Sequence, residues 1–269
     1  MIRLFTALYH EAQPFIEEFS MIRDESCRPF QRFISGDGDL SLLVTGTGAV
    51  RCAAAVSFDM SKSLSADDLL INIGTAGCSR ELADEGSLFI IDKIMSSEGL
   101  RDLYPDMLID LSGTGIGEAP VMSYTRPVEI IPEGTLADME SYAFFESASI
   151  FTGPHRIMVL KVISDHGDTG SLNGNNLSGL TGRFIPLIRA LNGKESLSGS
   201  KEEEISFPEG IYMTEYMKNR YRELIRYAKT EGTDVNKLIE DMRCEGLIPA
   251  SDKRRSAEAL SELERRIIS

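Results

Sequence analysis

Short apolar runs alternate along most of the chain with segments that are polar or amphipathic. The runs have the length and the aliphatic, β-branched composition of buried strands, and they cover residues 2–8, 40–44, 69–73, 87–94 and 156–163. Helices are expected between them, at residues 142–151, at the alanine-rich residues 50–61 and from residue 14 onward. This alternation predicts an α/β domain with a largely buried sheet and helices on both of its faces.

The composition changes at residues 192–210, where Gly and Ser accompany a Lys-Glu-Glu-Glu run. We interpret this stretch as a linker between a main domain at residues 1–191 and a helical extension at residues 211–269. Two or three helices are expected in the extension, one of them beginning after Ser251-Asp252. We favour a helical cap, packed on the main domain or on a second subunit, over a separate functional module. Helical spacing is followed by Tyr212, Tyr216, Met217, Leu224, Ile225 and Ala228.

Charge and cysteine usage restrict the classes of partner. A net charge of −14 argues against nucleic acid, because a duplex binder needs a basic face that releases counterions. The four cysteines have no Cys-x-x-Cys spacing and the three histidines show no ligand spacing, so we expect no metal, no cofactor and no disulfide framework. With no signal-like or membrane-spanning run, the sequence predicts a cytoplasmic protein that is neither exported nor anchored.

Four motifs bear chemistry and lie at the ends of expected strands or just before an expected helix: Gly46-Thr47-Gly48, Asn72-Ile73-Gly74-Thr75-Ala76-Gly77, Asp138-Met139-Glu140 and Lys161-Val162-Ile163-Ser164-Asp165. Open α/β sheets bind ligands at the carboxyl ends of their strands, and the last motif ends there. Over roughly the first 190 residues this combination resembles the nucleoside phosphorylase superfamily, and within it the methylthioadenosine/S-adenosylhomocysteine nucleosidases. The resemblance implies a three-layer α/β/α domain with a central mixed sheet, a small-molecule nucleoside substrate, and a homo-oligomer, either a dimer or a hexamer.

Three carboxylates can meet the needs of N-glycosidic cleavage, which requires an acid at the leaving base, polar contacts to the ribose and a positioned nucleophile. The resemblance implies that Glu11 orients the attacking water and that Glu140 binds the ribose hydroxyls, with Met139 packed on the sugar. It implies that Asp165 donates a proton to the imidazole nitrogen of the purine. Taken alone, Glu11 is equally an exposed acid at a helix start, and Asp165 a cap of the next segment.

The remaining motif residues complete the substrate-binding set that the resemblance implies. Gly46 and Gly48 belong to the loop on the nucleophile side. Thr75 takes the place of a serine near the water and the ribose, and the backbone of Ala76 and Gly77 meets the base. Ser164 belongs to the same Ile-Ser-Asp strand end as Asp165. Lys161 replaces an arginine that helps to hold the water, which keeps the charge but loses the bidentate fork.

The chain departs from the family at the base and at the phosphate. The segment before Asp138 is shorter than in the nucleosidases, which have there a loop with an aromatic residue that stacks on the purine. Tyr124, within residues 121–128, is the candidate replacement. Asn72 stands where phosphorylases carry a phosphate-binding arginine, so hydrolysis is favoured over phosphorolysis. Arg51 remains either a phosphate ligand or an exposed helix arginine.

Two other readings remain open at this point. The nearest is a purine nucleoside phosphorylase that uses phosphate. The other is a nucleoside-binding sensor or scaffold without turnover, whose helical extension serves as an interaction element. Residues 113–117, Gly-Thr-Gly-Ile-Gly, are expected to form a flexible loop rather than a phosphate cradle, since no Lys-Ser/Thr follows them.

Overall fold

The computed structural model divides the chain into two compact units, residues 1–195 and 196–269. It describes residues 1–62, 65, 67–106, 109, 111, 113–168, 174–193, 211–212, 217, 221, 224–225, 228, 235–248 and 252–268. Most of the expected linker lies outside these residues. No helix in the described part of the chain is long and apolar enough to cross a membrane.

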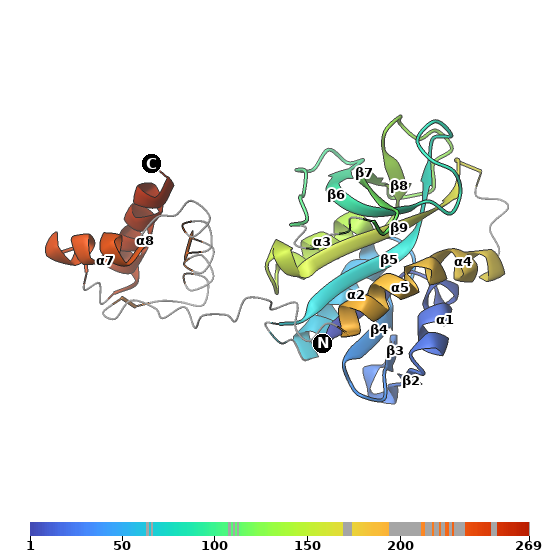
Figure 1. Ribbon diagram of the computed structural model, residues 1–269, viewed down its shortest axis with the longest axis horizontal. Helices are drawn as coiled ribbons and strands as arrows, with labels where there is room; N and C mark the ends of the chain where they lie inside the picture. Colours follow the sequence, from blue (N-terminus) through green and yellow to red (C-terminus); the bar gives the residue numbers. More distant parts are fainter. Residues whose placement is uncertain are drawn as a thin grey trace. The chain divides into compact units, whose positions relative to one another are not determined.

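Unit 1 is built on a mixed sheet whose described strands run in the order β2-β3-β4-β1-β5-β8-β7-β6-β9. Because β9 also pairs with β5, the strands β5, β8, β7, β6 and β9 close into a ring, as Figure 1 shows. β1, β4, β5 and β9 run parallel where they pair, whereas β8 is antiparallel to β5. The strands are β1 (Ile2–Thr6), β2 (Ile22–Arg23), β3 (Gln31–Ile34), β4 (Leu40–Val44), β5 (Leu69–Cys78), β6 (Leu88–Ser96), β7 (Ile116–Ser123), β8 (Leu136–Asp138) and β9 (Ile157–Asp165).

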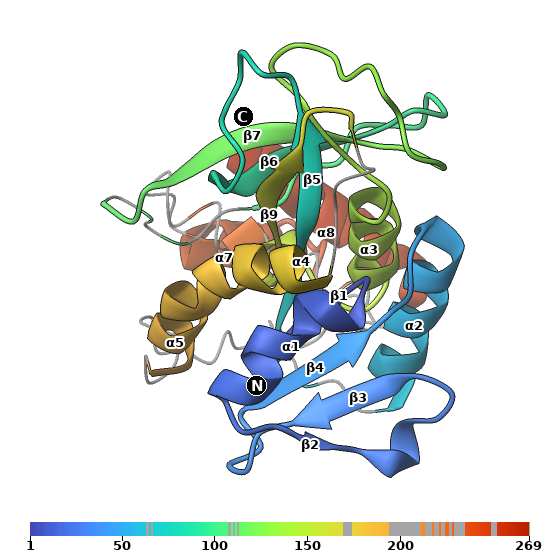
Figure 2. The ribbon, with the colours of Figure 1, turned by 90° about the vertical axis from the view of Figure 1, so that its right-hand side faces the viewer.

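Helices cover both faces of this sheet (Figure 2). On one face α2 (Ala49–Lys62) and α3 (Ser141–Ser149) pack on alternate strand residues such as Phe5, Leu70 and Val159. On the other face α1 (Tyr9–Glu18) and α5 (Ile185–Gly193) pack on the intervening residues, such as Leu4 and Leu160. The predicted three-layer α/β/α domain with a central mixed sheet is therefore confirmed. Shorter helices are η1 (Glu25–Cys27), η2 (Pro154–Arg156), α4 (Gly174–Thr181) and η4 (Gly182–Phe184).

Several element boundaries differ from the prediction. β5 continues to Cys78, so Gly74 and Gly77 lie inside a strand rather than after one, and small residues there allow β9 to pair closely on the same strand. Helix α1 begins at Tyr9 instead of near Pro14, because the Glu11 side chain binds backbone N–H groups at its start. β7 and β8 were missed, and the predicted loop at residues 113–117 runs into β7 at Ile116.

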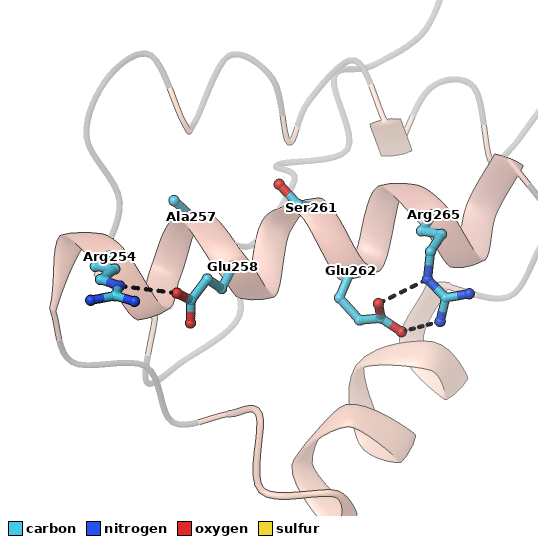
Figure 3. Close-up of a pocket in the computed structure, with 6 residues that line it drawn as sticks. All are labelled: Arg254, Ala257, Glu258, Ser261, Glu262 and Arg265. Carbon is cyan, nitrogen blue, oxygen red and sulfur yellow. Dashed lines mark hydrogen bonds and ion pairs between the residues drawn. The ribbon is translucent and has the colours of Figure 1, made fainter.

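Unit 2 contains α7 (Val235–Cys244) and α8 (Lys253–Ile268) and has an apolar core of its own, to which Tyr221, Met242 and Leu263 contribute. Along the exposed face of α8, Arg254 pairs with Glu258 and Glu262 with Arg265 (Figure 3). The surface hollow beside them is lined by this one helix, and its drawn charges bind each other. It offers no convergent group for catalysis.

Candidate functional site

A cavity of about 160 Å³ opens in unit 1 at the carboxyl ends of β1, β5 and β9. Four carboxylates lie in its wall, those of Glu11, Asp138, Glu140 and Asp165. These residues come from the start of α1, the end of β8, the start of α3 and the end of β9. Their convergence from distant parts of the sequence marks this cavity as the candidate site. Also in the wall are the predicted substrate-binding residues Thr75, Ala76, Gly77, Met139 and Ser164.

Glu11 is buried, only 3% exposed, and both of its carboxylate oxygens are held. Oε2 accepts hydrogen bonds from the backbone N–H groups of Ala7 and Leu8, each at 3.0 Å. Oε1 accepts from the backbone N–H of Thr75 at 3.0 Å and from its hydroxyl at 3.1 Å. The alternative of an exposed helix-start acid is therefore wrong. Four donors fix the carboxylate in one orientation at the floor of the cavity.

Asp138, in the cavity wall, forms a buried ion pair with Lys161, which does not line the cavity, and both side chains are 1% exposed. The Lys161 ammonium lies 2.7 Å from Asp138 Oδ2 and donates to Asn72 Oδ1 at 2.9 Å. Burial alone would raise the pKa of Asp138, but the ammonium and the hydroxyls of Ser123 and Ser141 outweigh it and hold the pKa below its usual value. Burial likewise opposes the charge on Lys161, yet Asp138 and Glu140 keep its pKa raised.

The negative charge of Glu140 is offset by fewer hydrogen bonds than that of the other carboxylates in the cavity wall. Its Oε1 accepts a hydrogen bond of 2.6 Å from the backbone N–H of Gly48, directly before helix α2, whose dipole favours a negative charge there. Burial, together with the negative charge of Asp138, nevertheless raises the pKa of Glu140 to about 7. Glu140 therefore changes its charge near neutral pH.

Asp165 ends β9 and faces the loop side of the cavity. Its Oδ2 accepts from the Ser164 hydroxyl at 2.7 Å and its Oδ1 from the Gly167 backbone N–H at 3.0 Å. The space above Gly77 is filled by neighbours, since a Cβ there would lie 3.0 Å from Asp165 Oδ1 and 2.8 Å from Ile131 Cδ1. A glycine is thus required where Ile131 and Asp165 pack over β5.

Three residues of the predicted substrate-binding set lie outside the cavity wall. Lys161 lies below it, although its ammonium approaches Glu11: a Cβ on Gly74 would lie 3.4 Å from both Lys161 Nζ and Glu11 Oε1. Gly48 acts through its N–H on Glu140, and Gly46, at φ +85°, leaves space for the Arg51 side chain. Lys161 and Gly48 thus support lining carboxylates instead of lining the cavity themselves.

The sequence reasoning assigned no role to several residues in the wall. Arg126, Pro127, Val128 and Ile131 belong to the segment between β7 and β8, of which only Tyr124 was singled out as a stacking candidate. Tyr124 does line the cavity. In the part of the chain that the structure describes, no group of three or more His, Cys, Asp or Glu side chains is arranged to hold a metal ion.

Comparison with solved structures identifies the fold as that of the nucleosidases. The 5′-methylthioadenosine/S-adenosylhomocysteine nucleosidase of S. pneumoniae, solved with a transition-state inhibitor, superposes with a TM-score of 0.59 at 15% identity, covering 71% of this chain and 97% of that one. The 5′-methylthioadenosine nucleosidase of Arabidopsis thaliana gives a TM-score of 0.61 at 16% identity, covering 72% of this chain and 96% of the other. The resemblance predicted from the motifs is confirmed at the level of the fold.

Futalosine hydrolase of Helicobacter pylori has the same fold, with a TM-score of 0.58 at 13% identity and coverage of 71% of this chain and 96% of that one. By sequence, no protein-family model and no curated protein matches the chain. Identities this low establish the architecture alone. The chemistry must therefore be argued from the cavity itself.

Proposed function

We propose that this protein hydrolyses the N-glycosidic bond of a purine nucleoside, or of a thioether nucleoside of the methylthioadenosine or S-adenosylhomocysteine type, and releases the base. The observation that carries the proposal is the convergence of Glu11, Glu140 and Asp165 on one cavity. Each is held differently: Glu11 by four donors, Asp165 by two, and Glu140 by one N–H beside another carboxylate. Such differences of environment allow neighbouring carboxylates to take different roles.

In this proposal Asp165 acts as the acid. Its carboxyl group gives a proton to the imidazole nitrogen of the purine while the bond between that base and the sugar breaks, and the bonding electrons leave with the base. The Ser164 hydroxyl and the Gly167 N–H keep the carboxyl group aimed along the cavity. The sugar becomes cationic, and Glu140 accepts hydrogen bonds from its ribose hydroxyls.

Glu11 acts on the water. Its oxygens are already occupied by four donors, so a water that passes a proton to Glu11 displaces the Thr75 hydroxyl, its longest contact at 3.1 Å, from Oε1. The water oxygen then bonds to the cationic sugar carbon and its proton goes to Glu11. Cleavage thus moves one proton from Asp165 to the base and one from the water to Glu11, and exchange with solvent, which returns a proton to Asp165 and removes one from Glu11, restores the enzyme.

Electrostatics support water over phosphate as the nucleophile. A phosphate dianion would enter a cavity lined by four carboxylates, whereas a cationic sugar is stabilised there. The side chain of Asn72 is committed to Lys161 and to the carbonyl of Phe5. Arg51 does not line the cavity in the described structure. The lining charge therefore disfavours phosphorolysis.

The decisive experiment measures base release from a panel of purine nucleosides, with and without phosphate. We expect free base and free ribose without phosphate. Release that depends on phosphate, with accumulation of ribose 1-phosphate, would make the protein a phosphorylase. Tight binding without release would make it a nucleoside sensor. An Asp168→Asn variant is the matched control for Asp165→Asn, since it removes an exposed carboxylate three residues along the chain.

A further inference from the structure

The mechanism above assigns no role to Arg126, a charged side chain in the cavity wall. Among the lining residues of the described structure, Arg126 is the only cation. It also has no ion-pair or hydrogen-bond partner within the described residues, whereas Lys161 below the cavity is fully engaged with Asp138 and Asn72. A guanidinium beside four carboxylates that pairs with none of them is available to a ligand.

The backbone of Arg126 is held in place by its neighbours. The Tyr124 N–H donates to the Asp138 carbonyl at 2.7 Å, which ties the start of the segment to the end of β8. Farther along the segment, the Glu129 carbonyl oxygen packs against Gly167. The two are so close that a Cβ atom at residue 167 would lie 2.2 Å from this oxygen. Pro127 follows Arg126 directly and restricts it to extended backbone. Arg126 is therefore placed between two fixed points.

The same segment forms the part of the wall beside the proposed acid. Ile131 packs over Gly77 beside Asp165 Oδ1, and Gly167, on which Glu129 packs, donates to that same oxygen. The part of the ligand that Asp165 protonates is the imidazole ring of the base. Arg126 thus belongs to the wall that surrounds the base rather than the ribose, which the mechanism assigns to Glu140.

A guanidinium has five N–H donors and no acceptor. A 6-oxopurine presents a carbonyl oxygen next to its imidazole nitrogen, whereas a 6-aminopurine presents an amino group that donates. Arginine binds the oxo edge and gains nothing from the amino edge, as its pairing with guanine in DNA recognition illustrates. A departing 6-oxopurine also gathers negative charge on that oxygen, which a guanidinium stabilises.

We propose that Arg126 makes the site selective for 6-oxopurine nucleosides, by donating to the base oxygen while Asp165 protonates the adjacent imidazole nitrogen. This inference rests on the proposed function and narrows its substrate to the inosine and guanosine class of base. It disfavours 6-aminopurine substrates, including the methylthioadenosine type.

The test compares kcat/KM for inosine and adenosine in the wild-type protein, in Arg126→Gln and in Arg23→Ala, a control that removes an exposed arginine elsewhere on the surface. We expect the wild type to prefer inosine. Arg126→Gln should lower kcat/KM for inosine by about ten- to hundredfold, the value of one good arginine contact to a base, and change adenosine by less than about threefold. Arg23→Ala should behave as the wild type. Equal losses on both nucleosides, no loss on either, or a wild-type preference for adenosine would overturn the inference.

A binding measurement separates this inference from the proposed function. Dissociation constants for hypoxanthine and adenine are measured by calorimetry, which needs no turnover. If no nucleoside is cleaved but hypoxanthine binding alone weakens in Arg126→Gln, hydrolysis is refuted and the base assignment stands. If cleavage occurs while both bases bind equally to wild type and variant, the base assignment is refuted and hydrolysis stands. A variant that instead loses a phosphate dependence of the reaction would make Arg126 an anion ligand and overturn the inference.

Discussion

Replacing Glu140 by glutamine should make the protein more stable and less able to bind a nucleoside. The substitution keeps the length of the side chain and an oxygen that can accept from the Gly48 N–H, but it removes the ionisable group. Glu140 is 9% exposed and lies beside the Asp138 carboxylate, so its negative charge opposes folding at neutral pH.

The magnitude follows from the pKa. The pKa of Glu140 is raised from 4.5 to about 7, and that difference corresponds to about 3 kcal/mol. An unfolded chain loses this proton near pH 4.5 while the folded chain keeps it until about pH 7. Between these values the folded state binds more protons, so stability falls as pH rises. Above about pH 7 the full penalty is present, and below about pH 4.5 it is absent.

Urea unfolding of wild type and Glu140→Gln at several values between pH 4 and pH 8 measures the difference directly. We expect the two proteins to be nearly equal at the acidic end and the variant to be more stable by up to about 3 kcal/mol at the basic end. Groups distant from residue 140 titrate alike in both proteins and cancel in the difference. Glu146→Gln, an exposed change on the same helix, should give a difference that is small and independent of pH.

Ligand binding should depend on pH in the opposite direction from stability and should strengthen as the pH rises. Ribose hydroxyls donate to an ionised carboxylate, so wild-type affinity for a non-hydrolysable C-nucleoside should fall about tenfold for each pH unit below 7. Glu140→Gln should bind the C-nucleoside weakly at every pH and should not show the fall in affinity below pH 7. A stability difference that stays flat across the titration would refute the argument from burial. Wild-type affinity in the variant at pH 8 would refute the ribose contact.

Four further changes test the rest of the site. Asp165→Asn should reduce base release by about a hundred- to ten-thousandfold while affinity for a C-nucleoside changes little, and unchanged turnover would remove this residue from the mechanism. Glu11→Gln should slow single-turnover hydrolysis by a similar factor, unless phosphate is the nucleophile. Lys161→Met leaves its buried carboxylate partner unpaired and should cost about 3–5 kcal/mol of unfolding free energy in urea, whereas a loss below about 1 kcal/mol would contradict the buried pair. Gly167→Ala combines a φ of +94° with a collision against a carbonyl oxygen, so a stability loss of about 1–3 kcal/mol is expected, and an unaltered melting curve would disprove the close approach.

The fold was largely predictable because a buried strand is indicated by the short apolar run of residues that forms it. The run at residues 40–44 corresponds to β4 without any change of boundary, since five consecutive apolar or small residues flanked by polar ones leave little choice. β5 was predicted too short because Gly74 to Gly77 read as a turn. Its extension depends on pairing with β9, which is a contact between distant segments. β8, three residues long, carries no local signal of its own.

The site residues likewise fall into two groups, those that a local motif predicts and those that only the folded structure reveals. The placement of Glu140 and Asp165 near one another was predictable from two motifs that end sheet elements. The engagement of Lys161 was not, because Asp138 and Asn72 approach it from other strands and only the folded structure shows that its charge is already paired. Arg126 was missed for a similar reason, since nothing in its neighbouring residues shows that the segment folds over the end of β9.

The pairing of Lys161 also decides the electrostatic character of the cavity. A lysine with a free ammonium at this place would offer an anion a ligand. Here Asp138 lies 2.7 Å from that ammonium and neutralises it, while Glu11 and Asp165 receive donors that are themselves uncharged. The ammonium therefore cancels the charge of one lining carboxylate, that of Asp138, and leaves Glu11, Glu140 and Asp165 without an ion-pair partner among the described residues. A cavity with this charge favours a cationic sugar over a phosphate dianion, and Arg126, the lining cation of the described structure, is the residue that we propose binds the base oxygen.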